Sequence, residues 1–222
     1  MATLLLRLAA PLQSWGIDSK FDTRKTEREP SKSGVIGLLA AALGYKRYES
    51  EKIAELSRLR FGVRTDREGK LLHDFHMVHG ADNSYVTHRY YLSDAVFVVG
   101  IEGERERLEE LVYALSHPVY PLFLGRRSCP PTLPLCLGIR ELPLSEALEK
   151  EPSRSDKTSD SMRITIDADE NATSVSAKRD LPLSFDPRRR SYGYRGVTEK
   201  TLRFEKKAEP VEHDPFEELE DR

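Results

Sequence analysis

The sequence has few cysteines and no long hydrophobic run. Its two cysteines, Cys129 and Cys136, cannot form a disulfide framework or, by themselves, a complete zinc site. We therefore expect a protein of a reducing, cytoplasmic compartment. No apolar run reaches the ~18 residues that a membrane span needs. The apolar N-terminal residues 1–10 contain Arg7 and no cleavage-like site, which favours a first strand over a signal peptide.

The net charge is also small, −2 at neutral pH, but it is unevenly distributed. The chain has 35 basic residues (Lys and Arg) and 37 acidic ones (Asp and Glu). Residues 205–222 contain only three of the basic residues but eight of the acidic ones. We expect this acidic segment to be a disordered tail. The rest of the chain is mildly basic, which permits a polyanionic partner but does not demand one.

Hydrophobic periodicity predicts an α+β fold. Strand patterns occupy residues 3–8, 60–64, 92–101 and 162–167. A first helix pattern ends at Gly44, and two more occupy residues 50–59 and 107–116. The first helix can be capped by Ser31 or Ser33. Residues 60–64 alternate basic with small or apolar side chains, as in a strand with one polar face. This order suits a ferredoxin-like sheet with its helices on one face, followed by a β-rich extension.

Three basic segments with aromatic neighbours are the main functional signal. They are residues 20–32, residues 126–127 and residues 188–195. Arginine and lysine neutralise phosphates, while aromatic faces stack on unpaired bases, so together the segments favour a surface for single-stranded RNA. The loop at residues 20–32 leads into a helix start, whose unpaired amides also attract anions.

Residues 125–128, Gly-Arg-Arg-Ser, form a second candidate phosphate site. Two guanidinium groups beside backbone amides suit a phosphate. The segment lacks the spacing and the GK[ST] ending of a Walker loop, and a solvated turn with salt bridges is the alternative. Trp15 is expected to cover the core and not to stack on a base.

Four histidines, His73, His76, His79 and His88, lie close together in the sequence. On a strand, His73 and His79 share a face but lie roughly 20 Å apart, so they cannot bind one ion. We expect no metal and no cofactor. The histidines then serve as stacking or hydrogen-bonding groups on a hairpin, or are plain surface residues.

Several sequence strings carry a resemblance to a known family. They are Leu-Arg-Leu-Ala-Ala-Pro-Leu-Gln-Ser-Trp-Gly (residues 6–16), Thr-Arg (23–24), Pro-Ser-Lys-Ser-Gly-Val-Ile-Gly-Leu-Leu (30–39), Tyr-Leu-Ser-Asp-Ala-Val-Phe (91–97) and Tyr-Pro-Leu-Phe-Leu-Gly-Arg-Arg-Ser-Cys-Pro (120–130). In this order and spacing they resemble CasD-type subunits of type I-E CRISPR Cascade complexes, which belong to the RAMP superfamily. The resemblance covers residues 3–138.

The resemblance implies a domain organisation. Residues 1–140 would form a ferredoxin-like, RNA-recognition-type RAMP domain, with a protruding β-hairpin thumb at about residues 73–91. Beyond the resemblance, the strand patterns predict a small β-rich C-terminal extension at residues 141–204, and the composition predicts the acidic tail at residues 205–222.

The resemblance also implies a non-catalytic, crRNA-binding role in antiviral defence. Such a subunit holds the 5′ handle of the guide RNA, caps the backbone filament of a ribonucleoprotein complex and packs against the CasC backbone subunit and the large subunit CasA. It meets target DNA only through the complex, and it contacts no membrane. The positions that match the family's basic loop, helix start and turn are Arg24, Arg28, Ser31, Lys32, Ser33, Arg126, Arg127 and Ser128. Location in the thumb adds His76, Tyr85 and Arg89.

Two other readings stay open at this point. Related subunits in other CRISPR types cut their own repeat RNA, so a metal-independent endoribonuclease is the alternative. It needs a base and an acid, for which His76, His117 and Tyr45 are available, but the spacing places no pair of them together and we expect no catalytic residue. A protein–protein module that never touches RNA is the third reading.

Overall fold

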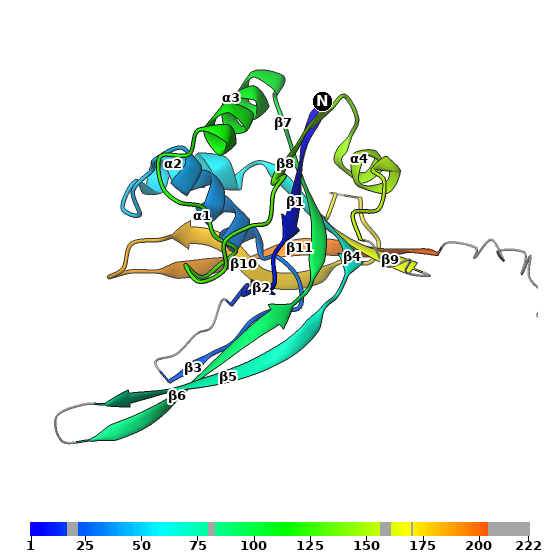
Figure 1. The fold of residues 1–222 in the computed structure, drawn as a ribbon. Coiled ribbons are helices and arrows are strands. Elements are labelled where there is room, and N and C mark those ends of the chain that lie inside the picture. Colours follow the sequence, from blue (N-terminus) through cyan, green and yellow to red (C-terminus); the bar gives the residue numbers. More distant parts are fainter. Residues whose placement is uncertain (17–21, 80–82, 156–160, 170, 204–222) are drawn as a thin grey trace, which may run out of the picture.

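The computed structural model describes residues 1–16, 22–79, 83–155, 161–169 and 171–203 (Figure 1). The expected acidic tail lies outside these residues, as do residues 20–21 of the expected basic loop. Within the described ranges, no helix combines the length and the apolar character needed to cross a membrane.

A seven-stranded antiparallel sheet forms the centre of the molecule (Figure 1). Its order is β10-β11-β9-β4-β7-β1-β8. The strands are β1 (Ala2–Ala9), β4 (Arg60–Arg67), β7 (Val96–Gly103), β8 (Cys136–Arg140), β9 (Ser161–Asp167), β10 (Ser176–Ser184) and β11 (Ser191–Arg203). The first four in the chain form the contiguous block β4-β7-β1-β8. Helices connect β1 to β4 and β7 to β8.

Helices cover both faces of this sheet. On one face lie α1 (Lys32–Ala42), α2 (Ser50–Ser57) and α3 (Arg105–Ser116), packed on Leu4, Leu6 and Leu8 of β1. On the other lies α4 (Leu144–Lys150), packed on Leu5 and Val98. Successive side chains of a strand point to opposite faces, so the unbroken aliphatic run of β1 serves both cores. The expectation that all helices lie on one face was therefore wrong, because α4 was not anticipated.

Strand β4 corrects the expectation of a polar face at residues 60–64. The side chain of Arg64 is only 1% exposed, and its Nε donates to Asp66 at 2.7 Å. Its Nη1 donates to the backbone carbonyls of Leu148 and Glu151 at the end of α4. Arg64 on the basic face of this strand is thus covered by α4, and its charge is paired internally.

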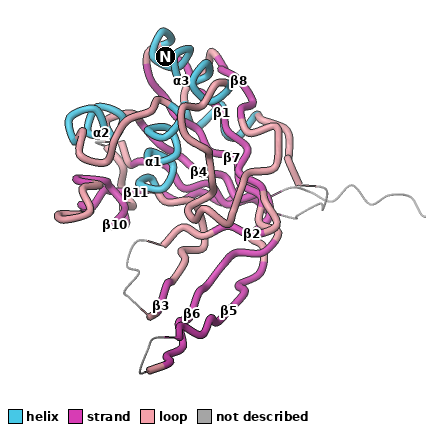
Figure 2. Tube along the Cα trace, turned by 60° about the vertical axis from the view of Figure 1, so that its left-hand side comes forward, coloured by secondary structure: helices cyan, strands magenta, loops and turns pink. Residues whose placement is uncertain are grey.

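A long hairpin projects from the body of the molecule, as Figures 1 and 2 both show. It consists of β5 (Lys70–His79) and β6 (Ser84–Ser93), paired from Lys70↔Ser93 to His79↔Ser84. It extends slightly beyond the expected residues 73–91. The short strands β2 (Leu12–Gln13) and β3 (Thr23–Arg24) pair with β6. The pairing with β2 lies at the base of the hairpin and the pairing with β3 halfway along β6, so both attach the hairpin to the chain segment that precedes α1.

The C-terminal region joins the main sheet and does not form a sheet of its own. Strand β9 pairs with β4, and β11 pairs with β9 and β10. We call β10 and β11, with the residues that join them, the C-terminal hairpin. It contacts both α1 and α2, and Figure 1 shows it crossing beneath these helices.

Two glycines in α1 make a matched pair for a stability test. A Cβ at Gly34 would lie 2.8 Å from the buried ring of Trp15, whereas one at Gly37 would lie 3.8 Å from Phe185, an ordinary contact. We expect Gly34→Ala to lower the free energy of unfolding by about 1–3 kcal/mol through overpacking. Gly37→Ala should be neutral or stabilising by up to about 1 kcal/mol, since alanine favours a helix. Urea denaturation of both variants checks this, and equal midpoints would contradict it.

Candidate nucleic-acid interface

Two adjoining cavities run along α1, with volumes of about 600 and 890 Å³. They share Ser33, Gly34, Gly125 and Arg190, and we call them together the basic groove. The basic side chains that line the groove are Arg24, Lys46, Arg47, Arg126, Arg127, Arg179 and Arg190. Among the described residues, no Asp or Glu lines it. The groove therefore attracts anions along its whole length.

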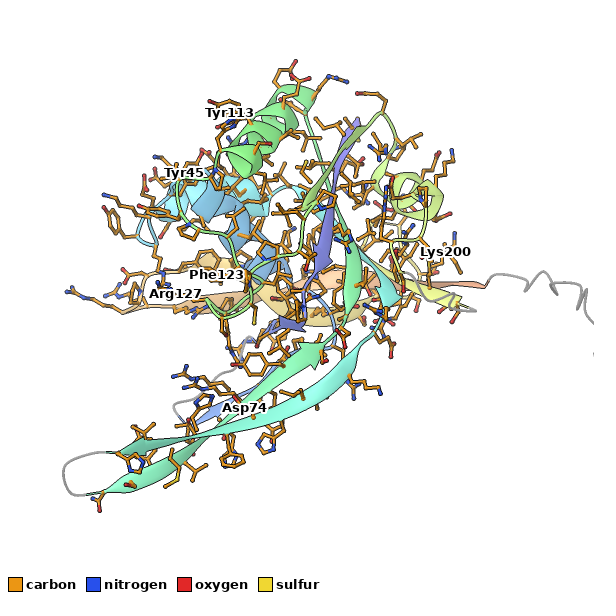
Figure 3. The ribbon with its side chains drawn as sticks, viewed as in Figure 1. Tyr45, Asp74, Tyr113, Phe123, Arg127 and Lys200 are labelled. Atoms are coloured by element: carbon orange, nitrogen blue, oxygen red, sulfur yellow. The ribbon has the colours of Figure 1, made fainter. Side chains whose placement is uncertain are left out.

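The larger cavity is also rich in aromatic side chains. They are Tyr45, Tyr48, Tyr120, Phe123 and Phe185. Figure 3 labels three of the lining residues, Tyr45, Phe123 and Arg127. The smaller cavity adds Tyr192 and the edge of the buried Trp15. Rings beside guanidinium groups are the pattern that binds unstacked bases and their phosphates.

The start of α1 is built differently from the expectation. Ser31 is the cap, since its Oγ accepts from the amide of Gly34 at 3.2 Å. The carboxylate of Asp180 accepts from the amide of Lys32 at 2.8 Å. The anion expected at this helix start is thus a side chain of the protein itself. Asp180 lies 148 residues further along the chain, so no local pattern marks it.

Lys32 does not present its charge to the groove. Its side chain is 5% exposed, and its Nζ forms an ion pair with Asp167 at 2.8 Å. Ser31 and Ser33 are also buried, although both line the smaller cavity. Of the three residues expected at the helix start, two border the groove and the lysine serves the fold.

Arg126 joins three segments of the site. Its guanidinium lies 4.5 Å from the ring centroid of Tyr91 at the base of the long hairpin. Its Nη2 donates to the backbone carbonyl of Arg24 at 2.8 Å. Its Nη1 is buried and has no partner among the described residues. Arg126 therefore holds the basic loop in place.

The turn that carries Arg126 fits closely on the opening segment of the chain. Gly125 has a φ of +86°, and a Cβ there would lie 1.6 Å from the carbonyl oxygen of Ser14. The amide of Ser14 in turn donates to the carbonyl of Leu124 at 3.1 Å. A glycine is required here both by the left-handed backbone and by the close approach.

The other residues expected in the loop and the turn divide into two groups. Arg127 is exposed and lines the larger cavity. Arg28 and Ser128 are exposed too, but they are not among the described residues that line the groove. Cys129 beside Ser128 is buried, and burial raises the pKa of its thiol against the opposing effects of Ser128 and Arg126.

The three residues expected in the thumb share one face of the long hairpin. Successive positions of a strand alternate, and the register pairs Val78 with Tyr85 and Asp74 with Arg89. His76, Tyr85 and Arg89 therefore lie on the same face as Tyr91, the residue that contacts Arg126. Arg89 is also adjacent to Arg24 through the β3–β6 pairing. This face continues from the groove along the hairpin.

The histidines form contacts that strand spacing alone does not reveal. His73 Nε2 lies 2.9 Å from Nδ1 of His88 on the neighbouring strand, and the ring of His73 stacks on Tyr90. His76 Nε2 is 2.6 Å from the carboxylate of Asp74, which Figure 3 labels. Across the described ranges, no group of three or more His, Cys, Asp or Glu side chains is placed to hold a metal ion.

The side chains available to an endoribonuclease lie on separate elements. Tyr45, at the end of α1, accepts from Arg107 at 3.4 Å, and the ring of His117 stacks on Tyr113 after α3. His76 lies on the long hairpin, where it pairs with Asp74. Each of these groups is engaged by a different neighbour, and no acid–base pair is assembled from them.

Reasoning from the sequence placed residues 188–195 on the expected RNA surface, but it assigned no individual site residue on the C-terminal hairpin, which also lines the groove. Arg179, Phe185, Arg190 and Tyr192 all line it. A signal was present, because residues 188–195 form one of the three basic segments. The resemblance ended at residue 138, however, and it assigned no site residue beyond the turn.

Comparison with known proteins gives the chain a family. The family model described as "CRISPR-associated protein (Cas_Cas5)" matches residues 3–198. CRISPR system Cascade subunit CasD of Escherichia coli (strain K12) is 38% identical over 176 residues, which cover 69% of this chain and 79% of that protein.

Two solved structures of CRISPR-associated proteins are similar to this chain in both sequence and fold. One, titled "Crystal structure of Cas protein", is 43% identical, with a TM-score of 0.72 over 90% of this chain and 95% of that one. A chain of a "CRISPR RNA-guided surveillance complex" is 32% identical, with a TM-score of 0.76 over 90% of each chain. The chain therefore belongs to the Cas5 family of CRISPR-associated proteins, as the match over residues 3–198 shows.

Proposed function

We propose that this chain is a CasD-type subunit of a Cascade complex, which holds the 5′ handle of the crRNA in the basic groove without cutting it. The observation that carries the proposal is the groove itself, where seven basic side chains from distant segments meet with no acidic residue among the described lining. The β4-β7-β1-β8 block with its two helical connections supports the ferredoxin-like arrangement of a RAMP domain.

The two cavities bind different parts of a single strand, the smaller one its phosphates and the larger one its bases. In the smaller one, the exposed Arg24 lies where a guanidinium group can bind phosphate oxygens, and Arg126 holds the backbone of Arg24 in place and adds positive charge. In the larger one, rings such as Tyr120 and Phe123 lie beside Arg127, where unpaired bases stack. A handle that passes along α1 meets phosphate ligands first and base platforms next.

The long hairpin acts as the thumb in this proposal. Its groove-side face carries His76, Tyr85 and Arg89 toward the RNA. The opposite face carries exposed apolar side chains, among them Phe75 and Met77, which suit a protein neighbour. We assign that neighbour as the CasC backbone subunit. CasA packs elsewhere on the chain, and target DNA is met only through the assembled complex.

Salt dependence tests the grip on phosphates. If about four phosphates are neutralised, the logarithm of the affinity for a handle oligonucleotide should fall with a slope of about −2.8 against the logarithm of salt concentration. This is roughly a 50-fold loss between 50 and 200 mM salt. Fluorescence anisotropy with labelled RNA measures it. A flat response would contradict the proposal and favour a protein–protein module.

Absence of cleavage is the second test. Purified protein incubated with its cognate repeat RNA in EDTA should leave the RNA intact, because Tyr45, His117 and His76, the side chains considered for acid–base chemistry, lie on separate elements. Denaturing gels resolve the products, and RNA alone serves as the control. Specific cuts at the handle boundary would support the endoribonuclease reading instead.

A further inference from the structure

The C-terminal hairpin forms one wall of the basic groove. From this hairpin, Arg179, Arg190 and Tyr192 line the smaller cavity, and Phe185, Pro187 and Arg190 line the larger one. Arg190 is the side chain of this hairpin common to both lining sets, and its guanidinium lies 5.4 Å from the ring centroid of Tyr192. A cation and a ring are thus held together where the two cavities meet.

We propose that the C-terminal hairpin is an RNA-gripping element, in which Arg190 binds a phosphate and Tyr192 stacks on a base of the single strand. The inference rests on the proposed function. It adds a wall opposite the turn at residues 124–128, so that the strand is held from two sides. Phe185, which packs near Gly37 of α1, extends the same wall into the larger cavity.

A buried charge cluster sets the position of this wall. The side chain of Asp180 on β10 is 0% exposed and accepts two hydrogen bonds from Arg195 on β11, at 2.6 and 2.9 Å. The same carboxylate binds the amide of Lys32 at the start of α1. Arg195 also pairs with Asp167 at 2.6 Å, and Asp167 pairs with Lys32. Asp180 is therefore a positioning residue that fixes the hairpin against α1.

The two carboxylates of this cluster keep Arg195 charged. Burial alone acts to lower the pKa of Arg195, but the hydrogen bonds and charges of Asp180 and Asp167 outweigh it and raise the pKa. A second buried carboxylate, Glu29, reinforces the link by binding Lys178 of β10 and Thr165 of β9. Moving the hairpin away from α1 would break these buried ion pairs and leave charges without partners, which is energetically costly. The groove is therefore preorganised for its ligand.

The run of three arginines at residues 188–190 supplies a matched control. All three are exposed, but Arg188 and Arg189 are not among the described residues that line either cavity. With a labelled single-stranded handle RNA, we expect Arg190→Ala to weaken binding about tenfold and to reduce the salt slope by about 0.7. Arg188→Ala should change the affinity less than twofold.

Tyr192 tests the stacking contact separately from charge. Tyr192→Ala should weaken binding about fivefold or more, because a base–ring contact is lost, whereas Tyr192→Phe keeps the ring and should bind as the parent does. If Arg190→Ala and Arg188→Ala are indistinguishable, or if Tyr192→Ala binds normally, the inference is wrong. Loss of binding in Arg24 variants would still uphold the proposed function, and a parent protein that binds no RNA would overturn both.

Hydrogen exchange, measured together with RNA affinity, tests the positioning role of Asp180. Asp180→Asn keeps the shape and an acceptor for the Lys32 amide but removes the charge that faces Arg195. We expect weaker handle binding together with faster hydrogen exchange in β10 and β11, while exchange in β1 and β7 stays slow. Faster exchange in the hairpin with unchanged RNA affinity would show that this wall does not touch the RNA.

Discussion

The double substitution Arg24→Glu and Arg127→Glu should weaken binding of the handle RNA by about two orders of magnitude or more. Both side chains are exposed, one in each cavity of the groove. A hydrogen bond to a charged group contributes about 1.5–3 kcal/mol, so two lost contacts are enough for this effect. The new carboxylates also repel the neighbouring phosphates, which adds to the loss.

The measurement is a titration of labelled handle RNA at fixed salt, with thermal unfolding to confirm that the variant folds. A control with the same charge change is Arg28→Glu and Arg189→Glu, since both residues are exposed and neither lines the groove. If the control loses as much affinity as the groove variant, binding follows overall charge. The basic groove is then not the site.

Arg126 has a second, structural role, so a substitution there would not test the charge of the groove alone. Its stacking on Tyr91 and its hydrogen bond to the carbonyl of Arg24 hold the loop against the turn. A substitution there would disturb the groove wall as well as the charge. Sequence reasoning identified Arg126 as a phosphate ligand because a guanidinium in a glycine turn has that pattern. Which carbonyls it reaches depends on a loop about 100 residues earlier in the chain.

The sequence predicts best the elements whose signals are local. The cap at Ser31 with the apolar positions that follow it, and the aliphatic run of β1, both yielded the observed elements. The basic segments also meet at one groove, as their combination indicated. The predictions that were wrong concern residues whose partners lie far away in the sequence. Asp180, 148 residues after Lys32, accepts the hydrogen bond from the helix-start amide of Lys32 where an external anion was expected. Helix α4 covers Arg64 on a face of β4 whose sequence pattern indicates a polar, solvent-facing side.

Arg64 shows the same limit in a single side chain. In an alternating strand, an arginine indicates a solvent face, and nothing near it in the sequence marks a helix 84 residues later whose carbonyls it will bind. Asp66 follows at the next position on the same face and supplies the counter-charge. The pattern of charges two residues apart is compatible with either a surface or a buried pair. The covering helix decides between them.

This buried pair carries the largest stability effect that we expect. Asp66→Ala removes a carboxylate whose side chain is 0% exposed and leaves the guanidinium of Arg64, 1% exposed, without its counter-charge. It also removes the acceptor for the amide of Arg154, at 2.6 Å. Breaking one side of a buried ion pair costs about 3–5 kcal/mol, a large fraction of the stability of an ordinary domain.

Urea denaturation followed by circular dichroism measures this loss, and Glu146→Ala is the matched control. Glu146 pairs with Lys150 on α4, but the two side chains are 51% and 63% exposed, so its removal should change the free energy of unfolding by no more than about 1 kcal/mol. Equal effects of the two substitutions would mean that solvent reaches Arg64 and that α4 does not seal this face of the sheet. A large effect of Asp66→Ala alone would show that the carboxylate holds β4 and α4 together from inside the fold.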